Sequence, residues 1–412
     1  MILLPLALRS LANRRLAAGL TLATVALGVA LLLGVRQLRD EARASFASTV
    51  SGTDLIVGAR TGPVNLLLYS IFHVGEPTSE VSWPSYEAVA ALPDVAWAVP
   101  LALGDSHRGF RVVGTNADFF SHYRYGDKHA LVFDQGAAFA DAHEAVIGAA
   151  VAERLGYALG REIVLEHGVG TLTEQHADHP FRIAGILAPT GTPVDASVFV
   201  SLSSIEDIHA DWQSGMHVPG SARAASQVPK TITAFLLGLT SRAAALGLAR
   251  RINDAPGEPL LAILPGVALQ ELWSIAGAAE NALLVVSACV TVAALFGMLT
   301  AMVAMLDERR REMAVLRALG ARPRTIFGLL VAEATVLTLS GAALGVLLLY
   351  VALAFARSYL RARYGLDLGL APPGAGELVA LGAVCLGGGV AGCVPAWLAY
   401  RRTLADGLDA RL

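Results

Sequence analysis

The chain has 412 residues, of which 55% are hydrophobic and only 16% are charged. Soluble domains are closer to a quarter charged, so this composition indicates a protein that lies partly in a membrane. The formal net charge of −3 gives no indication of nucleic-acid binding. The three cysteines all lie inside apolar runs, so the sequence offers neither a disulfide framework nor a CxxC metal site.

The N-terminal segment, residues 1–36, is expected to be a cytoplasmic helix followed by the first membrane span. Arg9, Arg14 and Arg15 precede an uncharged run over residues 16–35. As a helix that run would be about 30 Å long, enough to cross a bilayer. A cleaved signal peptide is the alternative, but the run exceeds the usual apolar core of such a peptide. We therefore expect a retained anchor.

Residues 37–281 have the character of a globular domain. Short β-like runs alternate with helical runs, broken by Gly, Pro and Asp. The expected strands are 54–57, 96–103, 109–113, 163–165, 181–187, 197–200 and 231–239. The expected helices are 36–48, 85–91, 145–155, 202–210, 241–253 and 267–279, with a Pro-rich turn region over 253–265. This pattern predicts an α+β domain attached to the membrane at both ends.

An apolar run over residues 65–72 stands out inside this domain. It is either a buried strand or helix, or an exposed loop that contacts a lipidic substrate or a periplasmic partner. Gly62-Pro63 before it and Gly75 after it fit a mobile loop. The solvent accessibility of its leucines decides between these alternatives.

Three further spans are expected at residues 282–306, 326–356 and 378–399, with an outer loop over 357–377 and a tail over 400–412. Glu333 lies in the third span. A carboxylate at mid-membrane would indicate function, whereas one near the end of an overlong helix would be interfacial. Two pairs of glycines one turn apart are expected to let helices approach closely. They are Gly341 with Gly345, and Gly388 with Gly392.

Between the second and third spans, residues 307–325 are short, densely charged and helical in pattern. Glu308 and Glu312 can pair with neighbouring arginines one turn away. Gly320 suits a helix C-terminus. The apolar side is formed by Met313, Val315, Leu316 and Leu319. Such a helix can dock on a soluble partner and transmit force to both spans, or it can be a solvated basic loop that only fixes topology.

Arginine placement predicts the orientation. Arginines cluster in the N-terminal segment, the 307–325 segment and the C-terminal tail. Four spans place all three clusters on one side, and the positive-inside rule makes that side the cytoplasm. The globular domain then lies outside, although three arginines in the loop over 357–377 are a mild violation.

The 10 histidines all fall in the globular domain. His176 and His179 lie beside Glu174 and Asp178, as in a loose surface zinc site, although solvated polar loops explain the same pattern. The sequence contains no G-x-S-x-G elbow and no H-E-x-x-H motif. A membrane-anchored metalloenzyme is therefore the weakest alternative, and we expect a chain without catalytic residues.

Several motifs in order resemble the FtsX-like permease family, the membrane subunits of ABC transporters typified by MacB and the LolCDE complex. The most specific match is the E-x-A-V-L-R-A-L-G-A stretch from Glu312 to Ala321, followed by Glu333, Gly341 and Gly345. The other matching pieces are Leu8-Arg9-Ser10-Leu11 with Asn13-Arg14-Arg15, Val146-Ile147-Gly148, Phe181-Arg182-Ile183-Ala184-Gly185-Ile186-Leu187, and Pro395-Ala396 with Arg401-Arg402.

The resemblance implies an inner-membrane protein that works as a homodimer or with a paralogous permease. The ATPase-coupling residues would be Glu308, Glu312, Met313, Val315, Leu316, Leu319 and Gly320. Because the sequence has no G-x-x-x-x-G-K-[ST] motif, ATP and Mg²⁺ are expected on a separate ATPase subunit. ATP-driven motion would act, with or without a periplasmic partner, on lipoprotein, lipid, peptide or metal-linked cargo. The alternative is an FtsX-like transmitter that regulates a periplasmic enzyme without moving substrate.

Overall fold

The computed structural model describes residues 3–168, 174–175, 179–209, 212–213, 216–217, 229–306, 308–364 and 372–408. Its contacts divide the chain into two units. One consists of Met1–Glu41, Gly277–Ala356 and Gly369–Leu412, and the other of Ala42–Ala276 with Arg357–Leu368. We call the first the helical unit and the second the α/β unit.

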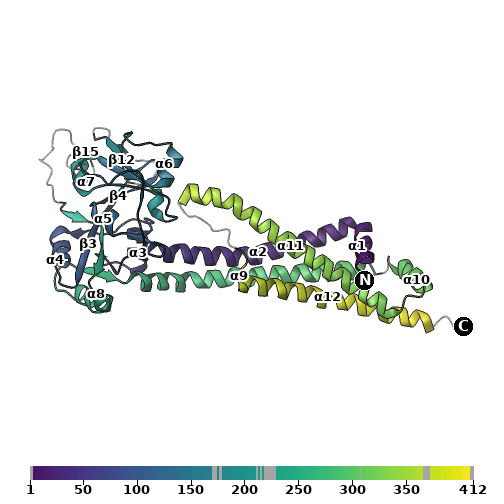
Figure 1. Cartoon of the computed structure of the whole chain (residues 1–412). Coiled ribbons are helices and arrows are strands. Elements are labelled where there is room, and N and C mark those ends of the chain that lie inside the picture. Colours follow the sequence, from purple (N-terminus) through teal and green to yellow (C-terminus); the bar gives the residue numbers. More distant parts are fainter. Residues whose placement is uncertain are drawn as a thin grey trace. The chain divides into compact units, whose positions relative to one another are not determined.

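The α/β unit is built on one mixed sheet (Figure 1). Its strand order is β18-β1-β17-β3-β4-β13-β8-β12-β7, with β9, β10 and β11 on side branches. The pairs β4 with β13 and β8 with β12 are parallel, and the other pairs along this order are antiparallel. The strands are β1 (Leu55–Ala59), β3 (Val95–His107), β4 (Phe110–Thr115), β7 (Phe133–Gly136), β8 (Glu144–Ile147), β9 (Glu162–Ile163), β10 (Glu166–His167), β11 (Glu174–Gln175), β12 (Phe181–Leu187), β13 (Ser197–Ser201), β17 (Ala234–Leu239) and β18 (Leu260–Ile263).

Three two-stranded pairs and eight short helices complete this unit within the described residues. The pairs join β2 (Val81–Ser82) to β16 (Thr231–Ile232), β5 (Arg124–Tyr125) to β6 (His129–Ala130), and β14 (Trp212–Gln213) to β15 (Met216–His217). The helices are α3 (Pro63–Ile71), α4 (Trp83–Ala90), α5 (Asp118–His122), α6 (Ala149–Leu155), η1 (Pro193–Ala196), α7 (Leu202–His209), η2 (Arg242–Ala244) and α8 (Ala245–Asn253).

Both faces of the sheet are buried, and side chains alternate between them as strand geometry requires. Leu236 in β17 belongs to a core cluster shared with α3 and α5. Its neighbours Phe235 and Leu237 belong to a second cluster, shared with α4 and α8. At β13, Phe199 joins the first cluster while Val198 and Val200 join a third one beside α6 and α7. Helices therefore cover both faces of the sheet.

The apolar run over residues 65–72 is helix α3, and the exposed-loop alternative is wrong. Leu66 and Leu67 are fully buried against β1 and β17. Phe72, directly after the helix, stacks on Phe46 with ring centroids 4.3 Å apart. Phe46 also meets Trp273 edge to face at 5.4 Å. This run is core, and it fixes the ends of two long helices to the sheet.

Two further expectations for this unit are wrong. Residues 145–155 do not form one helix, because β8 ends at Ile147 and α6 begins only at Ala149. Gly148 makes the turn, where an added Cβ would lie 2.2 Å from the carbonyl oxygen of Val194. The region 253–265 is not all turn, since Leu260–Ile263 forms edge strand β18 beside β1.

His73 predicts a pH dependence for the α/β unit. Its Nδ1 lies 2.8 Å from Ser197 Oγ, and burial together with the charge of Arg111 lowers its pKa to about 4. The pKa of His73 is lower in the folded protein than in the unfolded chain, so as the pH falls the unfolded chain takes up the proton first. The α/β unit is therefore most stable above about pH 6.5 and loses stability as the pH falls towards 4. The difference between the two pKa values of His73 corresponds to a loss of about 3 kcal/mol at most in the free energy of unfolding.

We expect urea unfolding of the full-length protein, followed by intrinsic tryptophan fluorescence, to show this loss of stability between pH 7 and pH 4, since four of the five tryptophans belong to the α/β unit. His73→Asn should flatten the dependence, since asparagine tolerates the φ of +55° at this position. His107, whose pKa is also lowered by burial, accounts for a remaining slope. An unchanged slope in His73→Asn would contradict this assignment.

The helical unit contains four helices that are long and apolar enough to cross a membrane, within the described residues. They are α2 (Arg15–Thr49), α9 (Pro265–Ala304), α11 (Pro323–Tyr364) and α12 (Ala375–Leu408), and the unit boundaries fall inside α2, α9 and α11. Two shorter helices accompany them, α1 (Leu3–Asn13) and α10 (Arg310–Ala318). Figure 1 shows the long helices running alongside one another.

Glycines lie where these helices meet. An added Cβ at Gly341 of α11 would lie 2.7 Å from Val25 of α2, and one at Gly345 would lie 2.6 Å from the Ala26 carbonyl oxygen. On α12, a Cβ at Gly388 would lie 2.1 Å from Thr338 Oγ1, and one at Gly392 would lie 2.4 Å from Ala334 Cβ. The first pair therefore faces α2 and the second faces α11, in the manner of small residues at helix interfaces.

Candidate functional site: the α10 junction

Helix α10 lies between two spans and is bounded by residues that end helices. It occupies Arg310–Ala318, close to the segment expected from the sequence. Gly320 follows with a φ of +93°, a conformation that favours glycine, and α11 begins at Pro323. The chain therefore reverses within a few residues on each side of α10.

The apolar side chains of α10 divide into two groups. Met313 packs against Leu306, Ile326 and Leu330, a core cluster of the helical unit. Val315 and Leu319 do not belong to this cluster, and the two residues are 59% and 81% exposed. They are four residues apart, so they lie together on one face of the helix. This exposed apolar face is expected to be covered by something other than the described part of the chain.

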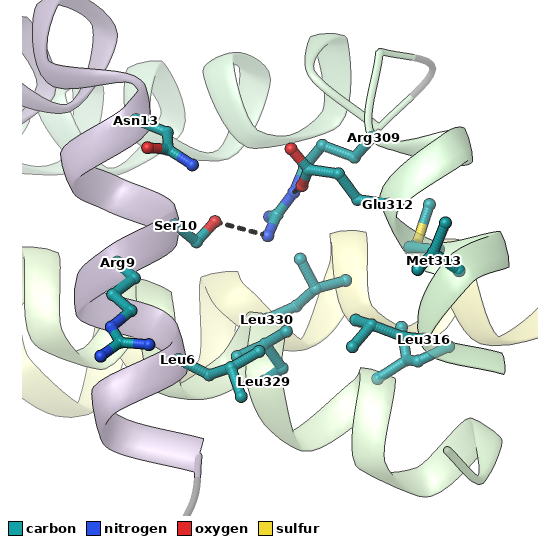
Figure 2. Close-up of a pocket in the computed structure, with 12 residues that line it drawn as sticks. Leu6, Arg9, Ser10, Asn13, Arg309, Glu312, Met313, Leu316, Leu329 and Leu330 are labelled. Atoms are coloured by element: carbon teal, nitrogen blue, oxygen red, sulfur yellow. Dashed lines mark hydrogen bonds and ion pairs between the residues drawn. The ribbon is translucent and has the colours of Figure 1, made fainter. Parts of the chain in front are cut away.

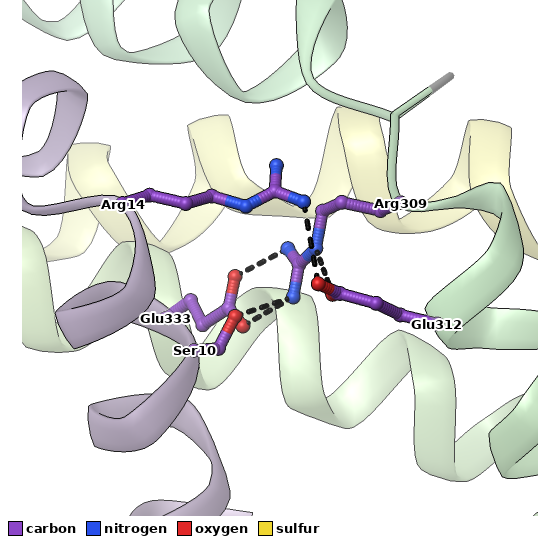
Figure 3. A network of polar contacts seen from close by, with 5 residues as sticks. All are labelled: Ser10, Arg14, Arg309, Glu312 and Glu333. Atoms are coloured by element: carbon purple, nitrogen blue, oxygen red, sulfur yellow. Dashed lines mark hydrogen bonds and ion pairs between the residues drawn. The ribbon is translucent and has the colours of Figure 1, made fainter.

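A buried ion pair fixes the residue that precedes α10. Arg309 is 7% exposed and Glu333 of α11 is 2% exposed. The Arg309 Nη1 and Nη2 atoms each donate to one carboxylate oxygen of Glu333 at 2.6 Å. Figure 3 shows this bidentate contact together with the bond from Arg309 Nη2 to Ser10 Oγ, at 2.9 Å. Glu333 is therefore a paired carboxylate that joins α11 to the start of α10 and to α1.

Glu312 forms a second, more open layer of this network. It lies 3.6 Å from Arg309 Nε and 3.6 Å from Arg14 Nη2 (Figure 3). The Glu312 side chain is 52% exposed, so these pairs contribute little to stability. They nevertheless connect α10 to the short break between α1 and α2. Residues of α1, α10 and α11, with Arg14 from the break before α2, thus meet at one polar cluster.

An apolar cavity of about 520 Å³ lies next to this cluster. Its walls come from α1, α10 and α11 and from residues beside α10, as Figure 2 shows. The lining residues are Leu6, Arg9, Ser10, Asn13, Arg309, Glu312, Met313, Val315, Leu316, Ile326, Leu329 and Leu330. Leu316 thus faces this cavity, while Glu308 and Gly320 are exposed to solvent.

The sequence singled out α10 and Glu333 separately but did not bring them together. Arg309, the partner of Glu333, and Ser10, the third member, were not among the expected site residues. An arginine at the first turn after one span and a lone glutamate near the start of the next are the signal that could have paired them. Ser10 carries no such signal, because its role depends on how α1 folds back.

The zinc site expected at His176 and His179 stays a prediction. His176 lies outside the described residues, and the ring of His179 stacks on His143 with centroids 5.7 Å apart. Among the described residues, no three His, Cys, Asp or Glu side chains are grouped to hold a metal ion. His107 is a buried core histidine, with its Nδ1 2.6 Å from the Val164 carbonyl and its Nε2 3.0 Å from the Tyr157 hydroxyl.

The fold and this junction define a membrane-embedded subunit with a large domain inserted after its first span. Residues 18–235 match the family model of the MacB-like periplasmic core domain, and residues 284–404 match that of the FtsX-like permease C-terminal region. The chain therefore belongs to the FtsX-like, MacB-type permeases of ABC transporters. Permeases of this family are generally non-catalytic, reside in the inner membrane and work with ABC ATPase partners.

Two solved structures are similar to parts of the chain. One is the periplasmic region of MacB from Actinobacillus actinomycetemcomitans, at 9% identity and a TM-score of 0.34, covering 55% of this chain and 97% of that one. The other is the extracellular domain of the noncanonic ABC-type transporter YknZ from Gram-positive bacteria, at 13% identity and a TM-score of 0.31, covering 51% and 99%. A search of curated proteins returns no match.

Proposed function

We propose that this permease couples ATP hydrolysis by a separate ATPase subunit to a conformational change of its α/β unit on the periplasmic side. The observation that carries this proposal is the α10 junction. An exposed apolar face, Val315 with Leu319, belongs to a helix whose first turn is joined to α11 by the buried Arg309–Glu333 pair. A partner that moves α10 therefore also moves α11.

The partner that fits this face is an ATPase with an apolar recess on its surface. Arginines surround α10 in sequence, and the positive-inside rule places such a segment in the cytoplasm. ATP and Mg²⁺ would bind to that partner, and two permease copies, identical or paralogous, would complete the transporter. Of the coupling residues expected from the sequence, Val315 and Leu319 are the ones we place in the contact, whereas Met313 holds α10 on its own spans.

The connection towards the periplasm is proposed to run through α2 and α9. Each is a single helix that contains residues of both units. Within the helical unit they are joined by Thr291 Oγ1, which donates to the Gly28 carbonyl at 3.1 Å, and by Arg39 and Glu280, 3.0 Å apart. Within the α/β unit, Phe46 of α2 and Trp273 of α9 pack together. The two helices are thus in contact at several points along their length and can move as a pair.

The docking role is tested by placing a charge on the exposed face of α10. Val315→Asp with Leu319→Asp should abolish the stimulation of the cognate ATPase by the permease, because carboxylates would have to be desolvated in an apolar recess. Val315→Ile with Leu319→Met is the matched control, since both changes keep the face apolar. Both variants should fold, as these side chains are exposed. Normal stimulation in the aspartate variant would contradict the docking role.

The cargo is proposed to be a lipoprotein, lipid, peptide or metal-linked compound handled on the periplasmic side. Reconstitution with the ATPase and a labelled candidate cargo tests this against the transmitter alternative. ATP-dependent movement of cargo supports transport. Normal ATPase coupling together with ATP-dependent activation of a periplasmic hydrolase, and no cargo movement, would support the transmitter instead.

A further inference from the structure

The cavity beside α10 combines apolar walls with one cation that is not neutralised. Its apolar lining includes Leu6 of α1, Leu316 of α10, and Leu329 and Leu330 of α11. Its volume, about 520 Å³, lies in the range of sites for small ligands. In Figure 2 these leucines gather in the middle of the cavity, and Arg9 lies beside Leu6 on α1.

The charged groups around the cavity differ in whether an opposite charge neutralises them. Arg309 is neutralised by Glu333, and Glu312 on the α10 side is paired with Arg14 and Arg309. Arg9 lines the cavity, is exposed to solvent and makes no ion pair with any side chain that the structure describes. Asn13, one turn further along α1, adds an uncharged amide. The net charge presented to a ligand is therefore positive and is located at Arg9.

We propose that this cavity binds an acidic phospholipid, with acyl chain against the leucines and phosphate on Arg9 and Asn13. An apolar chain joined to an anion matches both features of the lining, whereas a free phosphate would leave the apolar walls uncovered. The lining residue Ile326 stands at the start of the third apolar run, where a span meets the lipid headgroups. Acidic lipids attract arginines at such a surface.

Such a lipid would contact α1, α10 and α11 together. It would therefore stabilise the arrangement of the junction that the Arg309–Glu333 pair also holds, and lipid composition would affect the permease. This proposal does not depend on the docking role of Val315 and Leu319, although Val315 also lies at the cavity wall. Its test uses the permease without the ATPase, so a failure of one proposal leaves the other unaffected.

The test is lipid binding to the delipidated full-length protein in detergent, measured by native mass spectrometry. The probes are phosphatidylglycerol, phosphatidylcholine with the same acyl chains, and glycerol phosphate without chains. We expect phosphatidylglycerol to bind about tenfold more tightly than the other two, as one charge-assisted contact in an apolar site allows. Arg9→Gln should remove this preference. Arg15→Gln is the matched control. It removes the same charge six residues further along the chain, from a side chain that does not line the cavity.

A second variant tests the cavity itself. Leu6→Phe with Leu329→Phe should fill part of the space and weaken phosphatidylglycerol binding, with an unchanged unfolding midpoint. Equal losses in Arg9→Gln and Arg15→Gln would show diffuse charge attraction and overturn the proposal. Glycerol phosphate binding as tightly as phosphatidylglycerol would identify a simple phosphate site and would also overturn it.

Discussion

Replacing Glu333 with leucine is expected to destabilise the helical unit by about 3–5 kcal/mol, because the buried Arg309 guanidinium would lose its bidentate partner. The loss should appear as a lower unfolding temperature in detergent and as lost stimulation of the ATPase. Glu333→Asp should show a smaller loss, since the shorter carboxylate cannot make both contacts at 2.6 Å.

A double replacement separates stability from coupling. Arg309→Met combined with Glu333→Leu removes both charges, and replacing a buried ion pair by apolar side chains is often neutral or stabilising. We expect this variant to recover most of the unfolding temperature but not the ATPase stimulation, because the start of α10 loses its polar contacts to α11 and α1 and only the apolar packing of Met313 remains. Full recovery of stimulation would show that the pair only supports the fold. An unchanged unfolding temperature in Glu333→Leu would contradict its burial.

The second large effect is expected at the glycines of α12. Gly388→Leu with Gly392→Leu would force side chains into Thr338 and Ala334 of α11, where even a Cβ would lie 2.1 Å and 2.4 Å from the nearest atoms. Overpacking of this kind costs about 1–3 kcal/mol at each site. The two spans would have to separate, so we expect little monodisperse protein and early unfolding.

Gly382→Leu is the matched control for this change. It lies on the same helix and is also glycine, but an added Cβ there meets nothing within 4 Å. Leucine has a higher helix propensity than glycine, so this variant should be as stable as the parent protein or more so. Equal damage from the control and the double variant would mean that glycine flexibility, rather than close packing, matters in α12.

The sequence was most informative where one physical signal dominates. The apolar runs predicted the four long helices because only length and hydropathy are needed to recognise them. The strand 181–187 was predicted with its observed bounds, since β-branched and aromatic residues alternate with exposed Arg182 at its start and apolar residues close its end. The coincidence of Gly320 with the end of α10 follows from its φ of +93°, which penalises other residues.

Prediction failed where a segment is short or a contact is remote. The sequence of Ala145, Val146 and Ile147 is as compatible with a helix as with a strand. These residues form a strand because their backbone pairs with β12 on one side and with β13 on the other. Strand β18 is an edge strand whose pairing with β1 cannot be read from its own residues. The Arg309–Glu333 contact joins residues that belong to different elements, so it depends on how the helices pack.

The central claim is that α10 and the α/β unit lie on opposite sides of the membrane, and labelling of single cysteines tests it most directly. In a background where Cys289, Cys385 and Cys393 are replaced by alanine, Leu319→Cys and Val132→Cys each introduce a thiol at an exposed apolar position. We predict that a membrane-impermeant maleimide labels position 319 only in inside-out vesicles and position 132 only in spheroplasts. Labelling of both positions from the same side would contradict the account.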